Sequence, residues 1–284
     1  MAQFTNQAQL SYNNSITNSN IAVGELLEVL SATKTAVIDT YQRNDEVTFI
    51  ISIVNSGTAP FSGLTITDNL GAYSFNTTTL VPLTYVEDSV LYYVNGTLQP
   101  TPAVVAEGTS LVISGINVPA GGNAIIVYET QANQFAPLEV DGIITNNATI
   151  SGGGLANAIT ASETITTEDT ADLTITKSVS PVPVSENGLL TYTFIIQNTG
   201  NTAADAASNI IITDTFNPIL SNLNVTLDGA TFPTANYTYD ETTGEFATLP
   251  GTITVPPATY TQNPDTGYYV INPGVTTLVI SGTV

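Results

Sequence analysis

The chain contains two copies of one series of motifs, and this internal repeat restricts its possible folds more than any other feature. Three pairs of segments match: 30–37 with 173–180, 47–59 with 190–203, and 64–71 with 210–217. The spacing also agrees, because 21 residues separate Lys34 from Asn55 and Lys177 from Asn198. Self-similarity of this kind marks a duplicated structural unit. We therefore expect two domains of the same fold.

Each copy consists of short alternating stretches that are separated by turn signals such as Asn-Ser-Gly and Pro-Ala-Gly-Gly. Thr, Val, Ile and Tyr are abundant, and these residues favour strands. The pattern predicts an all-β protein of two tandem immunoglobulin-like Greek-key β-sandwiches. We expect the first sandwich at 28–152 and the second at 171–284, with a linker at 153–170.

The two copies differ at their ends. In the first copy a strand signal at 118–132 is followed by another at 142–152, whereas the counterpart of the former, 271–284, is followed by none in this sequence. The missing strand has a match at the other end of the chain, because FTNQAQLSY (4–12) resembles ITNNATISG (144–152). The sequence thus predicts a second domain without its last strand, a donor strand at 1–14 and a linker at 15–27.

An unfilled slot in a sheet exposes backbone donors and acceptors, and it therefore favours the addition of a strand. The first domain stands between the slot and 4–12, so we expect the strand to come from a neighbouring subunit. Such a contact is heterologous and gives a head-to-tail homopolymer. The donor residues facing the core are expected to be Phe4, Asn6, Ala8, Leu10 and Tyr12. In the alternative interpretation, 4–12 is a frayed tail and the second domain closes with fewer strands.

Lys34 and Lys177 are two of only three basic residues, and they occupy the same position of the repeat. The period of two in a strand places Lys177 on the face of Leu173, Ile175 and Val179. This inward face rarely holds an unpaired lysine. Four polar residues are likewise in phase with apolar neighbours: Asn6, Asp68, Asn146 and Asp214. We expect each domain to bury one Lys, one Asn and one Asp.

Such a set of residues suits a spontaneous isopeptide bond. An apolar site lowers the pKa of an amine and raises that of a carboxylic acid, so a neutral amine can attack a carboxamide while the acid shuttles protons. We expect two bonds, each formed with loss of ammonia: Lys34 to Asn146 within the chain, assisted by Asp68, and Lys177 to Asn6 of the next subunit, assisted by Asp214. Glu129 is a rival acid in the first domain. The alternative is a buried Lys–Asp salt bridge that Asn caps by hydrogen bonds.

Composition excludes several classes of function. With 24 acidic and 3 basic residues the formal net charge is −21, which disfavours nucleic acid and anionic membranes as partners. The absence of His and Cys removes disulfides, the common zinc sites and His-based catalytic triads. We expect no metal, no cofactor, no membrane insertion and no enzyme activity beyond a single-turnover self-cross-linking.

Five motifs resemble a known family: ITNNATISG, ITKSVSP, IIQNTGNTA, ITDTF and PGVTTLVISGTV. They are similar to the immunoglobulin-like repeat domain of bacterial and archaeal surface proteins, in the short two-repeat clostridial form that includes spore-appendage fibre proteins. The resemblance implies a fibre on a spore or cell surface, assembled in the mother cell and released on its lysis. The start of the sequence, which lacks a secretory signal pattern, agrees with this expectation. Large members carry a wall anchor and many repeats, which this sequence lacks, so the anchoring partner stays open.

A second function deserves comparison, namely a surface adhesin or carbohydrate-binding module. Two tyrosine pairs are candidates for stacking platforms: Tyr92 with Tyr93, and Tyr268 with Tyr269. Adjacent aromatic residues in a strand more often place one ring in the core and one on the surface. The sequence therefore favours the fibre subunit over the binding module.

Overall fold

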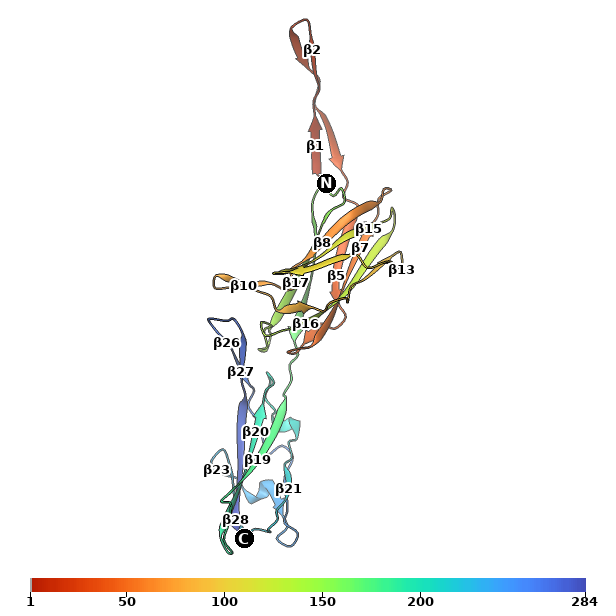
Figure 1. The fold of residues 1–284 in the computed structure, drawn as a ribbon. Helices are drawn as coiled ribbons and strands as arrows, with labels where there is room; N and C mark the ends of the chain where they lie inside the picture. The colour runs from red at the N-terminus through yellow and green to blue at the C-terminus, as the bar shows by residue number, and fades with distance from the viewer. Residues whose placement is uncertain (1) are drawn as a thin grey trace.

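A computed structural model describes residues 2–284 as an elongated molecule with three parts: an N-terminal hairpin, a first domain and a second domain (Figure 1). Strands make up all regular structure of the described residues except two 3-10 turns, Ala206–Ser208 and Thr234–Asn236. The all-β prediction is therefore confirmed. Within residues 2–284, no helix has the length and apolar character needed to cross a membrane.

The first domain is a sandwich of two sheets. One sheet runs in the order β13 (Thr97–Leu98), β12 (Leu91–Val94), β16 (Asn123–Ala132), β7 (Glu46–Asn55) and β5 (Leu30–Ala36), with β11 (Leu83–Tyr85) also on β16. The other runs in the order β14 (Ala103–Glu107), β15 (Ser110–Val118), β8 (Phe61–Asp68), β17 (Ile143–Gly152), β18 (Ile159–Thr167) and β6 (Thr40–Tyr41). A separate hairpin joins β9 (Tyr73–Phe75) and β10 (Thr78–Leu80).

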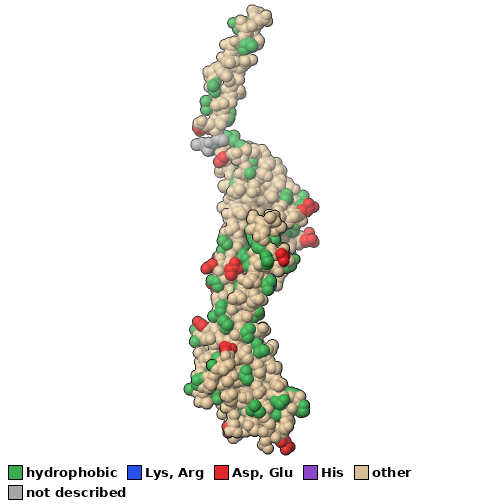
Figure 2. All heavy atoms as spheres, turned by 90° about the vertical axis from the view of Figure 1, so that its left-hand side faces the viewer, with side chains coloured by type: hydrophobic (Ala, Val, Ile, Leu, Met, Phe, Trp, Pro, Cys, Tyr) green, Lys and Arg blue, Asp and Glu red, His purple; other side chains and the backbone are tan. Residues whose placement is uncertain are grey.

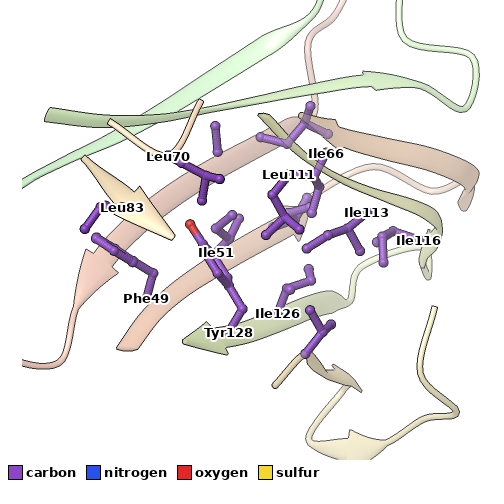
Figure 3. Packing of buried hydrophobic residues seen from close by; sticks show 14 of the residues in the cluster. Phe49, Ile51, Ile66, Leu70, Leu83, Leu111, Ile113, Ile116, Ile126 and Tyr128 are labelled. Atoms are coloured by element: carbon purple, nitrogen blue, oxygen red, sulfur yellow. The ribbon is translucent and has the colours of Figure 1, made fainter. Parts of the chain in front are cut away.

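The core of this domain follows from strict alternation along its strands. In β7 and β16 every second residue is buried, and β15 repeats the pattern on either side of an irregularity between Ser114 and Ile116. The inward side chains of the two sheets pack together in an apolar cluster, in which Tyr128 is the sole labelled residue that carries an oxygen (Figure 3). Sheets that pack face to face in this way bury one face of each strand.

The second domain repeats the strand order of the first but is smaller. One sheet is β19 (Leu173–Ser180), β20 (Leu189–Asn198), β28 (Gly274–Thr283), β22 (Ser221–Leu227) and β23 (Ala230–Thr231). The other is β21 (Thr213–Thr215), β25 (Glu245–Thr248) and β24 (Tyr237–Tyr239). The first sheet corresponds strand for strand to β5, β7, β16, β12 and β13, and the second to β8, β15 and β14. In the described part of the chain, β17, β18 and β6 have no counterpart in the second domain.

The N-terminal segment is a long hairpin that projects from the first domain (Figures 1 and 2). Its first arm contains β1 (Ala2–Asn6) and β2 (Gln9–Tyr12), and its second arm contains β3 (Ser15–Asn18) and β4 (Ala22–Leu26). In this hairpin β1 pairs with β4 and β2 with β3. The turn at Asn13 and Asn14 has φ values of 43° and 63°, a left-handed conformation that asparagine tolerates.

Two expected linkers are therefore structured. Residues 15–27, predicted to be a linker, instead form the second arm of the N-terminal hairpin through β3 and β4. The predicted linker 153–170 contains β18, which pairs along β17 and belongs to the first domain. In both places the segment that was expected to be a linker forms backbone hydrogen bonds with the strand that precedes it.

A hairpin of the second domain braces the junction between the domains. In the first domain the tight turn 119–122 leads into β16, whereas in the second domain the equivalent place holds 258–272, which contains β26 (Thr259–Gln262) and β27 (Tyr269–Asn272). Arg43 Nη2 donates to the carbonyl oxygen of Tyr269 at 2.7 Å, and the amide of Tyr269 donates to the carbonyl of Gln134 at 3.0 Å. The ring of Tyr268 packs edge-on against Phe135 with centroids 5.2 Å apart.

Candidate functional site

A buried polar centre lies in the core of the first domain, and it joins three of the residues predicted from the sequence. Lys34 lies on β5, Asp68 ends β8, and Asn146 lies on β17. Lys34 Nζ lies 2.5 Å from Asp68 Oδ2, and both side chains are fully buried. The other oxygen of Asp68 accepts from the amide of Leu70 at 2.9 Å.

Tyr128, which the sequence interpretation missed, connects this ion pair to Asn146. Its hydroxyl donates to Asp68 Oδ2 at 2.6 Å and accepts from Asn146 Nδ2 at 3.3 Å. The signal was available, because alternation in β16 places Tyr128 in phase with Ala124 and Ile126 on the inward face. The same alternation turns Glu129 away from the centre, so Asp68 is the acid beside Lys34.

Among the buried side-chain polar atoms that the structure describes, Asn146 Oδ1 is the one without a hydrogen-bond partner. Leaving such an atom unsatisfied in a core costs about 1–3 kcal/mol. An unsatisfied buried group in a native protein calls for an explanation, such as stored strain, a catalytic role or a bound water or ion. The orphaned carbonyl oxygen is a feature that the Lys34–Asp68 ion pair alone does not explain.

The buried Lys34 amine loses its proton more readily than the amine of an exposed lysine. Burial lowers the pKa of Lys34 to about 8, and the negative charges of Asp68 and Glu163 oppose this shift only in part. Burial also raises the pKa of Tyr128 well above its usual value, and the charge of Asp68 adds to that effect. Lys34 Nζ lies 4.9 Å from the ring centroid of Phe49, which helps the core to accept the cationic form.

The second domain repeats half of this centre. Lys177 on β19 pairs with Asp214 on β21, but 40% of the lysine side chain and 16% of the aspartate side chain are exposed. Lys177 Nζ lies 4.5 Å from the ring centroid of Tyr192. Pairing of β28 with β20 places Ile280 where β16 carries Tyr128. Asn6 does not join Lys177 within the chain, since it lies on β1 opposite Ala22.

The exposure of Lys177 follows from an open edge. In the first domain β17 pairs with β8, and β18 lies beside β5. In the second domain β21 pairs only with β25 among the described strands, and every residue of β19 is exposed. Ile175, which belongs to the inward face of β19, is 53% exposed. The edge therefore presents both backbone groups and apolar side chains.

The N-terminal hairpin presents the pattern that this edge lacks. Phe4, Leu10 and Tyr12 are 58%, 59% and 58% exposed. Counted with a period of two along the arm formed by β1 and β2, they are in phase with Asn6 and Ala8. The matching residues of β17 are all buried: Ile144, Asn146, Ala148 and Ile150. One molecule thus carries an exposed hairpin that resembles the β17–β18 unit, and an open edge at β19 and β21 that corresponds to the strands β5 and β8 beside which that unit lies.

Three of the four tyrosines that were considered as candidate stacking platforms make packing or hydrogen-bond contacts within the protein. Tyr92 is buried, and its hydroxyl donates to the carbonyl of Asn117 at 2.8 Å and accepts from the amide of Asn117 at 2.9 Å. Tyr268 and Tyr269 belong to the hairpin that braces the domain junction. These contacts give Tyr92, Tyr268 and Tyr269 roles in packing. Among residues 2–284, no cluster of three or more acidic side chains has the geometry of a metal site.

No protein-family model matches the chain, and no curated protein matches it either. Among solved structures, the chain is similar to the major pilin subunit of Bacillus cereus (8% identity, TM-score 0.40, covering 96% of this chain and 73% of that one). It is also similar to the pilus backbone protein of Streptococcus pneumoniae (12%, TM-score 0.36, 86% and 55%). A third is a C-terminal fragment of the major pilin of Streptococcus agalactiae (11%, TM-score 0.35, 52% and 58%).

The chain thus spans 55% and 58% of the two streptococcal structures. At these identities and TM-scores the function has to be argued from the geometry of the chain itself.

Proposed function

We propose that the protein is a structural subunit of a surface filament, which polymerises head to tail when the N-terminal hairpin of one copy completes the second domain of another. One observation carries this proposal. Among residues 2–284 the second domain has no unit like the one that β17 and β18 supply to the first domain, and the N-terminal hairpin displays a unit of the same kind with its apolar face exposed. The place of assembly that we propose is the surface of a cell or spore.

The first domain provides the template for this contact. The arm formed by β1 and β2 would pair with β21 as β17 pairs with β8, and the arm formed by β3 and β4 would lie beside β19 as β18 lies beside β5. Donation of a whole hairpin covers both the backbone edge of β21 and the apolar face of β19. Each large apolar side chain buried in this way contributes about 1.5–3 kcal/mol, and Phe4, Leu10 and Tyr12 supply three of them.

The same contact would bring Asn6 to the position that Asn146 holds in the first domain. We propose that Lys34 and Asn146 form an intrachain isopeptide bond and that Lys177 and Asn6 of the next subunit form an intermolecular one. The orphaned oxygen of Asn146 and the lowered pKa of Lys34 support the first bond. The repetition of the Lys–Asp pair at Lys177 supports the second.

A pair of neighbouring substitutions tests the polymer. Leu10 and Gln9 are adjacent on β2 but point to opposite faces, so Leu10→Lys would place a charge in the core of the acceptor while Gln9→Lys would leave it in solvent. We expect Leu10→Lys to give monomers in electron microscopy and light scattering, and Gln9→Lys to give fibres. Normal fibres from Leu10→Lys would refute donation of this face.

A denaturing gel with peptide mass spectrometry tests the bonds separately from the polymer. Covalent multimers with Lys177 joined to Asn6 would establish the intermolecular bond. If the fibres dissociate on the gel into monomers with a mass one ammonia below that of the sequence, only the intrachain bond between Lys34 and Asn146 forms. Monomers of unmodified mass would refute both bonds and leave only strand exchange.

A further inference from the structure

We infer that Tyr128 is a catalytic residue that relays a proton to the leaving nitrogen of Asn146 when Lys34 bonds to it. This inference rests on the intrachain cross-link proposed above. The equivalent position in the second copy of the repeat is occupied by Ile280, which has no hydroxyl group. The two cross-linking centres are therefore chemically different.

The hydrogen bonds of the centre define the route. Asp68 Oδ2 contacts both Lys34 Nζ at 2.5 Å and the Tyr128 hydroxyl at 2.6 Å. Asn146 Nδ2, the leaving atom, donates to the Tyr128 hydroxyl at 3.3 Å. In the described structure the side chain of Asn146 has no other hydrogen bond. Hence the phenol lies between the acid and the nitrogen that must be protonated.

The proton balance requires such a route. The ammonium of Lys34 first gives a proton to Asp68, and the neutral Nζ then attacks Cγ of Asn146. The new Nζ–Cγ bond forms as Cγ–Nδ2 breaks, and Nδ2 needs one more proton to leave as ammonia. Asp68 passes its proton to the phenol oxygen while the phenol passes its own to Nδ2, so Tyr128 ends unchanged. Asp68 then takes a second proton from the attacking Nζ, which becomes the amide nitrogen. Of the three ammonium protons, one stays on the new amide, one leaves with ammonia and one ends on Asp68.

The burial of the phenol fits this role. Tyr128 is fully buried and stacks on Phe49, with centroids 5.7 Å apart, so its hydroxyl is held at a fixed position (Figure 3). The ring need not move for the relay: the phenol O–H, which donates to Asp68 in the structure, turns toward Nδ2 while protonated Asp68 donates to the phenol oxygen. General acid–base groups placed in this way contribute about 100- to 10,000-fold to a rate.

The test compares Tyr128→Phe with Tyr92→Phe in the full chain. Both substitutions remove one buried hydroxyl with two hydrogen bonds, but Tyr92 bonds only the backbone of Asn117. Loss of ammonia is followed by intact mass after timed synthesis, and folding by circular dichroism and thermal unfolding. We expect Tyr128→Phe to slow the loss at least about 100-fold and Tyr92→Phe to leave its rate unchanged.

A second measurement separates catalysis from packing if Tyr128→Phe folds poorly. Site-specific fluorotyrosines at position 128 keep the shape of the ring and grade the acidity of its phenol. We expect the rate to change with acidity, and a flat series would overturn the relay. Normal cross-linking of a folded Tyr128→Phe chain would also overturn the relay while leaving the bond in place. Absence of ammonia loss in the unaltered chain would instead refute the cross-link itself.

Discussion

The two domains place an equivalent lysine in opposite environments. Lys34 and Lys177 occupy the same position of the repeat and face an aspartate in the same way, yet the exposed fraction of the side chain is 0% for Lys34 and 40% for Lys177. The difference lies outside the strands that carry them, because β17 and β18 cover the first centre and nothing in the described chain covers the second. Burial of the lysine is thus a property of the completed sandwich.

Supplying the second domain with its own hairpin should abolish this difference. We expect a chain with residues 2–26 fused after Val284 through a flexible linker to close its own edge, remain monomeric and gain several kcal/mol of stability in the second domain, since three large apolar side chains become buried. Light scattering and chemical denaturation measure both effects. The same fusion with Leu10→Lys in the added copy is the control, and it should polymerise. A polymerising unaltered fusion would contradict the proposed site of insertion.

Removing the acid from each centre should sharpen the contrast. Asp68→Asn leaves the Lys34 ammonium buried without its partner, which costs about 3–5 kcal/mol. Asp214→Asn in the monomer breaks a partly exposed pair and should cost at most about 1 kcal/mol. Denaturant unfolding of the two variants gives the comparison, in a background that carries Leu10→Lys to prevent polymerisation and Asn146→Ala to prevent the intrachain cross-link. Equal losses would show that the two centres are not differently buried.

Removing the amide tests the covalent part of the first centre. Asn146→Ala should retain the unmodified mass and lose about 4.7 kcal/mol of unfolding free energy, by analogy with a cross-link that closes a loop of about 100 residues. Asn147→Ala is the matched control, because its side chain points to solvent. Mass spectrometry and thermal unfolding follow the two variants. If Asn146→Ala still lost ammonia and Asn147→Ala did not, the cross-link would involve Asn147 and not Asn146.

The smallest effect is a pH dependence of stability in the uncross-linked Asn146→Ala chain. Folding lowers the pKa of Lys34 from 10.5 to about 8, so the unfolded state binds more protons between these values. Stability should therefore rise with pH from about 8 toward 10, by at most about 1.4 kcal/mol per pH unit. Below pH 8 both states are protonated and the slope vanishes. A chain that combines Asn146→Ala with Lys34→Met should lack the rise, and a rise in that control would assign it to another group.

The sequence was sufficient to predict the repeat, the all-β class and the pairing of each lysine with its aspartate, because identical positions in two copies carry the same constraint. It did not reveal the second arm of the N-terminal hairpin. The pairing register shifts by one residue between Gln9–Asn18 and Asn6–Ala22, which breaks the alternation that identifies a strand. The Thr-rich β18 was missed for a related reason, since its pairing with β17 and β6 defines it as a strand.

The polar network was predictable only in part. Tyr128 is in phase with the core, but an aromatic residue in a strand normally serves packing. Its contacts with Asp68 and Asn146 depend on how β16, β8 and β17 from two sheets approach each other. The brace formed by 258–272 was also missed, because its role depends on contacts across the domain junction.

That brace has a mechanical consequence for an assembled thread. Arg43, the only arginine of the chain, fastens the second domain to the first through the hairpin of β26 and β27. The turn at 119–122, which occupies the same place in the first domain, carries no such extension toward a neighbour. We expect the joint inside each subunit to be stiff and the joint between subunits to be compliant. Bending would then concentrate at every second joint, so the thread would behave as a chain of rigid two-domain rods.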